Sequence, residues 1–302
     1  MIEAFGLTKV YGARKAVDDL SFRVRSGLVT GFLGPNGAGK STTIRMLTGL
    51  DRPTAGSSTV DGRPYDELDH PLREVGMLLD TRSAHPGRSA RNHLRILAAS
   101  NGIPFSRVDE VLGITGVEDV ADKRVKSFSL GMSQRFGLAV ALLGNPHTLL
   151  LDEPLNGLDA EGMRWVRNLL RGMAAEGRAV LISSHLMAEV EGTADRLVVI
   201  GRGRLVADTD TRGFIDGATE KRVRVETPHA DALTALIEAA GGRVERQAVD
   251  VLLVNGLARS EIGELAAANS LALHGLGDEV ASLEDAFMNT TRDDVEYHGK
   301  EY

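Results

Sequence analysis

A chain of 302 residues, 42% of them hydrophobic and 25% charged, is long enough to fold into one large domain and a smaller one. Its net charge of −7 provides no global basic field for nucleic acid, and the absence of cysteine excludes disulfides, thiolate metal sites and a cysteine nucleophile. The first residues lack the basic and apolar regions of a signal peptide, and no run reaches the roughly 18 apolar residues of a spanning helix. We therefore expect a globular protein that does not itself cross a membrane.

Strands and helices alternate along the first two thirds of the chain. Residues 15–24 alternate between apolar and polar side chains, which is typical of a half-buried strand. A second strand, Val29–Leu33, runs into a glycine-rich turn and then a helical pattern, and the pattern is mostly helical from about 86 to 145. Leu149–Leu151 and Val180–Ile182 are short, continuous apolar runs of the kind found in buried parallel strands. This alternation predicts an α/β sheet flanked by helices.

The texture changes after Gly217. The pattern predicts strands near 223–225, 244, 251–254 and 271–273, and helices near 230–239 and 260–267. The resulting order, β-α-β-β-α-β, predicts a small α+β domain of ferredoxin-like topology. The predicted domains are therefore 1–216, with a helical subdomain at about 86–145, and 217–290, followed by a polar tail at 291–302.

One segment has the form of a phosphate-binding loop. It matches G-x-x-x-x-G-K-[ST] without a mismatch and lies between a predicted strand and a predicted helix. Its residues, with the threonine that follows, are Gly34, Pro35, Asn36, Gly37, Ala38, Gly39, Lys40, Ser41 and Thr42. In such a loop successive backbone N–H groups and the positive end of the helix face one phosphate group. We expect Lys40 to contact the β- and γ-phosphates and the Ser41 hydroxyl to bind Mg²⁺; the alternative is a chance glycine-rich turn.

An acidic pair follows the apolar run 149–151. Asp152, at the carboxyl end of a strand, can hold Mg²⁺ through water, and Glu153 can polarise an attacking water. Many apolar runs that end in Asp-Glu are only strand ends, so the pair gains its meaning from Lys40. Together these residues predict a P-loop NTPase.

Residues 128–132, Phe-Ser-Leu-Gly-Met, lie about 20 residues before Asp152 and resemble the signature motif of the ABC transporter ATPases, usually Leu-Ser-Gly-Gly-Gln. Ser129 and Gly131 match this motif, and the other three positions differ as in related drug and peptide exporters. The resemblance covers most of residues 1–215. It implies an ABC-type P-loop fold, in which an antiparallel β subdomain and a helical subdomain join a mostly parallel core sheet.

In this family the signature of one subunit caps the ATP bound by the phosphate loop of the other. The chain carries one of each, so the resemblance implies a head-to-tail dimer of two copies. Read from its surroundings alone, Ser129 is an ordinary helix N-cap.

Three further positions match residues of the family's nucleotide site. Asp159, in Gly157-Leu158-Asp159, matches the D-loop, and His185, after a strand, matches the histidine that contacts the γ-phosphate. Tyr11 matches the aromatic that stacks on adenine, a contact that needs only a flat π face. A structural histidine and a core tyrosine are the ordinary alternatives.

Asp80 departs from the family pattern. It follows the strand-like residues 75–79, where the family usually places a glutamine that touches Mg²⁺ and senses the membrane partner. A carboxylate can still approach Mg²⁺, but it cannot donate a hydrogen bond. We predict that Asp80→Gln preserves ATP binding, and a loss of affinity beyond about tenfold would refute this.

The resemblance implies an ATP- and Mg²⁺-binding ATPase subunit at the inner, cytoplasmic face of the membrane, powering transport through a separate integral-membrane permease. Export of a drug, antibiotic or other hydrophobic compound is suggested by the signature variant and by residues 282–287, which resemble the ending of antibiotic and multidrug exporter ATPases. Two alternatives stay open. The first is a soluble ABC ATPase that acts on ribosomes or DNA, which would normally show a second cassette, zinc cysteines or a coiled-coil insertion. The second is a purely regulatory protein, against which Glu153 and His185 argue. We expect no nucleic-acid partner.

Overall fold

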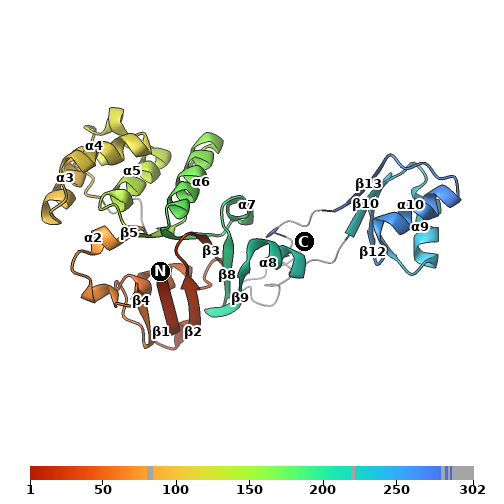
Figure 1. Cartoon of the computed structure of the whole chain (residues 1–302), viewed down its shortest axis with the longest axis horizontal. Coiled ribbons are helices and arrows are strands. Elements are labelled where there is room, and N and C mark those ends of the chain that lie inside the picture. The colour runs from red at the N-terminus through yellow and green to blue at the C-terminus, as the bar shows by residue number, and fades with distance from the viewer. Residues whose placement is uncertain (80–83, 219–221, 280–282, 285, 288–302) are drawn as a thin grey trace. The chain divides into compact units, whose positions relative to one another are not determined.

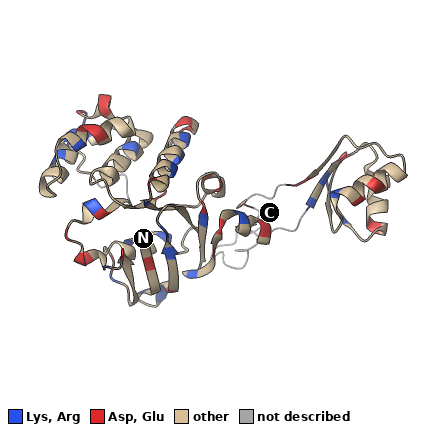
Figure 2. Ribbon diagram, viewed as in Figure 1, with Lys and Arg blue, Asp and Glu red and all other residues tan. Residues whose placement is uncertain are grey.

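The computed structural model describes residues 1–79, 84–218, 222–279, 283–284 and 286–287. Asp80, part of the 282–287 segment and the tail 291–302 lie outside these described residues. Contacts between residues divide the chain into two units, Met1–Thr211 and Arg212–Thr290 (Figure 1). In each unit, acidic and basic residues are interspersed along the ribbon (Figure 2).

A three-stranded antiparallel sheet opens the first unit. It is formed by β1 (Ile2–Tyr11), β2 (Arg14–Val24) and β4 (Ala55–Val60), in the order β2-β1-β4. The predicted alternation in β2 is seen at its end, where Leu20, Phe22 and Val24 are buried. It slips near Asp19, which has a φ of 53° and lies where the register against β1 is irregular. The buried face of this sheet joins the main core, since the Phe22 ring stacks on Phe32 of the next strand, with centroids 5.3 Å apart.

The six-stranded core sheet positions the functional residues. Its strands are β3 (Val29–Leu33), β5 (Val75–Leu78), β6 (Thr148–Asp152), β7 (Ala179–Ser184), β8 (Arg196–Gly201) and β9 (Arg204–Asp210). The order is β5-β6-β7-β3-β8-β9, parallel except between β8 and β9. Asp152 pairs with Ser183, and Leu33 pairs with Ser184. The loops after β3, β6 and β7 therefore leave the sheet at one edge.

Helices flank the core sheet, and those between residues 90 and 142 form the predicted helical subdomain (Figure 1). The helices of the first unit are α1 (Lys40–Leu47), α2 (Pro71–Glu74), α3 (Ala90–Ser100), α4 (Ser106–Thr115), α5 (Leu130–Leu142), α6 (Ala160–Ala175) and α7 (Met187–Glu191). Short 3₁₀ turns lie at Tyr65–Glu67, Glu118–Val120 and Val125–Ser127. Among the described residues, none of the helices has both the length and the apolar character needed to span a bilayer.

The second unit has the predicted order of strands and helices. It begins at Arg212, inside α8 (Thr211–Ala218), the helix in which the predicted boundary after residue 216 also falls. It continues with β10 (Arg222–Glu226), α9 (Ala230–Ala239), β11 (Arg243–Ala248), β12 (Val251–Asn255), α10 (Arg259–Ala268) and β13 (Gly275–Asp278). The strands form an antiparallel sheet in the order β11-β12-β10-β13, which is the ferredoxin-like arrangement.

The last strand of this unit lies later than predicted. It is β13, not residues 271–273. Leu271 and Leu273 instead pack against the core of the unit from a loop. The hydroxyl of Thr227 donates to the carbonyl of Ala272 at 2.7 Å, which diverts that backbone from the sheet. Apolar character in this stretch therefore marks burial rather than strand pairing.

Candidate nucleotide-binding site

The glycine-rich loop between β3 and α1 is held in a conformation that requires glycine. Gly39 has a φ of 101°, and a Cβ at this position would lie 2.6 Å from the carbonyl oxygen of Ala16. The first turn of α1 starts immediately afterwards, with the Thr43 N–H donating to the Gly39 carbonyl at 2.8 Å. The loop therefore presents its backbone and the N-terminus of α1 to one side, as a phosphate site requires.

Lys40 is folded back into the loop. Its ammonium donates to the carbonyls of Gly34, at 2.5 Å, and Pro35, at 3.2 Å, and the residue is only 8% exposed. Burial lowers the pKa of Lys40, and the negative charges of Glu153 and Asp152 partly oppose this shift. The site thus holds a poorly solvated cation that a phosphate could pair with.

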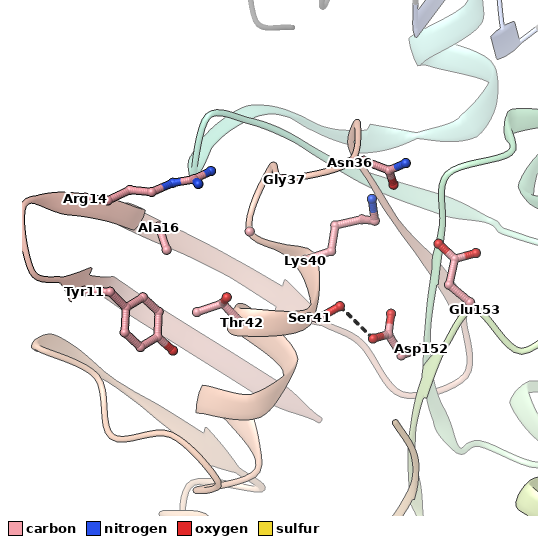
Figure 3. A pocket seen from close by; sticks show the side chains of 11 residues that line it. Tyr11, Arg14, Ala16, Asn36, Gly37, Lys40, Ser41, Thr42, Asp152 and Glu153 are labelled. Atoms are coloured by element: carbon pink, nitrogen blue, oxygen red, sulfur yellow. Dashed lines mark hydrogen bonds between the residues drawn. The ribbon is translucent and has the colours of Figure 1, made fainter. Parts of the chain in front are cut away.

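Ser41 and Asp152 bring two hard oxygen ligands together. The Ser41 hydroxyl donates to Asp152 Oδ2 at 2.8 Å (Figure 3). A hydroxyl and a carboxylate suit Mg²⁺, which usually takes one or two protein ligands and completes its shell with water and phosphate oxygens. Within the described part of the chain, there is no group of three or more His, Cys, Asp or Glu residues placed to hold a metal. A magnesium ion would therefore be held by Ser41 and Asp152, together with a bound phosphate.

Glu153 has an unusual backbone and a half-used carboxylate. Its φ is 51°, a region that costs energy for a residue with a side chain and is often found at functional sites. Gln134 steadies this backbone by donating to the Glu153 carbonyl at 2.9 Å. On the side chain, Oε1 lies 2.9 Å from Nδ1 of His185, whereas Oε2 is buried and has no hydrogen-bond partner among the residues that the structure describes. A buried carboxylate oxygen without a partner is unusual in a folded protein and points to a functional role for this side chain.

Ser183 organises the acidic pair and was missed in the sequence. It is fully buried on β7, where its hydroxyl donates to Asp152 Oδ1 and accepts the Glu153 N–H, the latter at 3.0 Å. One hydroxyl thereby fixes the carboxylate of the first acid and the backbone of the second. The signal that could have identified Ser183 is its place opposite Asp152 in the neighbouring parallel strand.

These elements surround a cavity of about 370 Å³ (Figure 3). Its lining consists of Tyr11, Arg14, Ala16, Asn36, Gly37, Gly39, Lys40, Ser41, Thr42, Asp152 and Glu153. Of these, only Arg14 and Ala16 were not predicted. The strand pairing of Tyr11 with Arg14 across a tight turn could have indicated them. In Figure 3, Tyr11 lies at the end of the cavity away from the acidic pair.

The remaining predicted residues fall into two groups. Gly34, Pro35 and Ala38 belong to the loop itself, and His185 reaches the site through Glu153. Ser129, Gly131 and Asp159, in contrast, are not part of the cavity lining.

Ser129 and Asp159 each cap the N-terminus of a helix. The exposed Ser129 accepts the Met132 N–H at 3.2 Å as the N-cap of α5, and the exposed Asp159 accepts the Gly162 N–H at 2.8 Å as the N-cap of α6. Within one chain these residues therefore have an ordinary structural role. Asp80 lies outside the described residues.

The chain is similar to known proteins in sequence and in structure. A family model described as "ABC transporter" matches residues 17–156, and a model for a domain of unknown function, DUF8746, matches residues 221–284. The uncharacterized ABC transporter ATP-binding protein YdbJ of Bacillus subtilis is 35% identical over 292 residues, covering 95% of this chain and 94% of that protein. The bacitracin transport ATP-binding protein BcrA of Bacillus licheniformis is 42% identical over 211 residues, 69% of each chain. A solved ATP binding subunit of an ABC transporter aligns with a TM-score of 0.66 and 27% identity, covering 72% of this chain and 92% of that one.

Proposed function

Because this chain belongs to the ATP-binding proteins of the ABC transporter family, we propose that the cavity between Tyr11 and Glu153 binds and hydrolyses Mg-ATP to power transport. One observation carries the site assignment. Lys40 and Ser41 at the start of α1 and Asp152 and Glu153 at the end of β6 line the same cavity, with the Ser41 hydroxyl 2.8 Å from Asp152. The residues that would bind phosphate, magnesium and the attacking water are thus adjacent.

Each residue has a distinct part in the proposed reaction. Lys40 pairs with the β- and γ-phosphate oxygens, while Ser41 and Asp152 hold Mg²⁺. When bound, Mg²⁺ neutralises charge on the phosphates. The free oxygen of Glu153 receives the attacking water, and His185 orients that carboxylate and faces the γ-phosphoryl group. At the far end of the cavity, Tyr11 stacks on the base.

A second copy of the chain would complete each site. Ser129 and Gly131 are exposed or half-buried on the surface, outside the cavity of their own subunit. A helix N-terminus of this kind offers N–H groups and a hydroxyl to an anion. In the proposed head-to-tail dimer, these residues and Asp159 of one copy face the triphosphate held by Lys40 of the other.

The energy of this cycle would be used by an integral-membrane permease, to which this chain would bind at the inner, cytoplasmic face of the membrane. The similarity to an ATP-binding protein named for bacitracin transport supports an antibiotic or other hydrophobic compound as the cargo, moved outward. Co-purification with a permease encoded beside this chain, followed by measurement of cargo-stimulated ATPase activity, tests the partner and the cargo class.

Phosphate release tests the reaction itself. The purified chain should release phosphate from ATP when Mg²⁺ is present and should stop when it is chelated. Lys40→Ala should abolish nucleotide binding in calorimetry, because the positive charge at the phosphates is lost. Wild-type protein that binds Mg-ATP without releasing phosphate would support a regulatory role instead, and protein that gives no heat with Mg-ATP would overturn the assignment.

A further inference from the structure

The ring of Tyr11 is tied to helix α1 through an acidic bridge. The Tyr11 hydroxyl donates to Asp51 Oδ2 at 3.1 Å, and Nε of Arg45 donates to the same oxygen at 2.8 Å. Arg45 lies in the last turn of α1, the helix that starts with Lys40 and Ser41. Two hydrogen bonds that share one carboxylate oxygen therefore join the aromatic end of the cavity to the helix of its phosphate end.

A lysine restrains the same ring. Nζ of Lys9 lies 5.1 Å from the centroid of the Tyr11 ring, within the range of a cation–π contact, and donates to the carbonyl of Arg52 at 2.5 Å. The ammonium group lies over one face of the ring. Together with the bond at the hydroxyl, this contact limits how the side chain can rotate.

Such restraint matters because Tyr11 is 49% exposed. An exposed side chain loses rotational freedom when a ligand stacks on it, and holding it in place beforehand reduces this cost. The hydrogen bond from Arg45 lowers the pKa of Asp51, so this carboxylate stays charged. Burial and the nearby Asp51 raise the pKa of Tyr11, so the phenol keeps the proton that it donates.

We propose that Asp51 is a positioning residue for the nucleobase: it fixes the Tyr11 ring to α1, so that the base-stacking face keeps a constant place relative to Lys40 and Ser41. This inference rests on the proposed function, in which Tyr11 contacts the base. Asp51 itself does not line the cavity and acts only through Tyr11.

Calorimetry with two ligands separates a base effect from a phosphate effect. The probes are ATP and inorganic tripolyphosphate, which has no base, each in magnesium buffer. Asp51→Ala should weaken ATP binding by about two- to fivefold, the size expected for a partly exposed charged contact, and leave tripolyphosphate binding unchanged. Tyr11→Phe keeps the ring but removes the hydroxyl, so it should have a similar effect. The double variant should bind ATP no more weakly than either single variant.

Asp208→Ala is a matched control. Asp208 accepts a hydrogen bond from Arg196 at 2.7 Å, and its side chain is 30% exposed. Asp51 likewise accepts a hydrogen bond from Arg45 at 2.8 Å, and its side chain is 22% exposed. Asp208 does not line this cavity. Its variant should bind both ligands as the wild type does.

The outcomes are distinct. Equal weakening of ATP and tripolyphosphate by Asp51→Ala would overturn the inference, since the phosphate end would then be disturbed. If Tyr11→Ala weakened ATP alone while Asp51→Ala had no effect, the inference would fail and the base site would stand. If Tyr11→Ala left ATP affinity unchanged, both the inference and the proposed base contact would be wrong.

Discussion

Nδ1 of His185 lies 2.9 Å from Oε1 of Glu153, although the two residues are 32 positions apart in the sequence. The first follows β7 and the second follows β6, and these neighbouring parallel strands end at the same edge of the sheet. The contact uses one oxygen of the carboxylate, and Oε2 has no partner among the described residues. In the proposed reaction, one oxygen of this side chain is therefore held by His185 and the other serves the attacking water.

Glu153→Gln should bind ATP but release phosphate more slowly, by about 10²- to 10⁴-fold, because the amide cannot take a proton from water. Unhydrolysed ATP should then hold two copies together. Size-exclusion chromatography with Mg-ATP should show a dimer for the variant and not with Mg-ADP. Undiminished phosphate release would remove Glu153 from the reaction.

Ser183→Ala should reduce both stability and turnover. The substitution removes a donor to Asp152 and an acceptor for the backbone of Glu153 in a fully buried place, which we expect to cost about 1–3 kcal/mol of unfolding free energy. Urea unfolding measures this loss, and phosphate release measures the effect of loosening the acidic pair. ATP affinity should change less than the turnover rate.

Thr148→Val provides the control on β6. Its hydroxyl is also fully buried, but it has no hydrogen-bond partner in the described part of the chain. Replacing an unsatisfied hydroxyl by a methyl group of the same shape should be neutral or stabilising. If both variants lost the same stability, the hydrogen bonds of Ser183 would not be the cause.

Mixing two inactive variants tests whether Ser129 acts on the other copy. Ser129→Asp keeps the N-cap of α5 but places a negative charge against the triphosphate, so it should be inactive alone, as should Lys40→Ala. A mixed dimer contains one site in which both residues are intact. The mixture should therefore release phosphate faster than the two variants do separately, and an additive rate would show that Ser129 serves its own subunit or neither.

His93 should make the protein less stable in weak acid. Burial, with a smaller contribution from the positive charge of Arg88, lowers the pKa of His93. Its Nδ1 is buried, and no described residue forms a hydrogen bond with it. The unfolded chain takes up a proton near pH 6.5, whereas the folded chain does so only at lower pH. Its stabilising contribution is thus complete above about pH 6.5 and is lost as the pH falls toward the folded-state pKa.

Urea unfolding between pH 5 and 8 tests this slope, which cannot exceed about 1.4 kcal/mol per pH unit for one group. His93→Gln should have a flatter profile than the wild type below neutral pH. His147→Gln, at an exposed position, should keep the wild-type profile. A profile for His93→Gln that matches the wild type would refute the prediction.

Local patterns were sufficient to predict the phosphate loop and the acidic pair. The loop has a fixed spacing, and Asp152 ends an apolar run that is typical of a buried strand, so the parallel sheet brings both to one edge. The β-α-β-β-α-β order of the second unit followed from alternating patterns in the same way. These features depend on residues that are close in sequence.

Residues that depend on pairing between distant segments were not predicted. Ser183 directly follows an apolar run, and nothing in the local sequence distinguishes it from other small polar residues. Its contacts with the acidic pair become evident only when β6 and β7 are placed in register. Strand β13 contains two glycines and one leucine, so a hydrophobic pattern cannot predict its pairing with β10. The bridge from Tyr11 to Arg45 likewise joins β1 to α1 through a loop residue, Asp51.

The contact between Leu130 and Gly157 has a consequence for communication between the two nucleotide sites. A Cβ at Gly157 would lie 2.3 Å from Cδ2 of Leu130, so the signature segment rests directly on the backbone of the D-loop. A displacement of one segment would therefore act on the other by direct contact, with no element between them. In the proposed dimer, a ligand that shifts the signature would also shift Asp159. By thermodynamic reciprocity, a ligand bound at the signature and a ligand bound at Asp159 would change each other's affinity by the same factor.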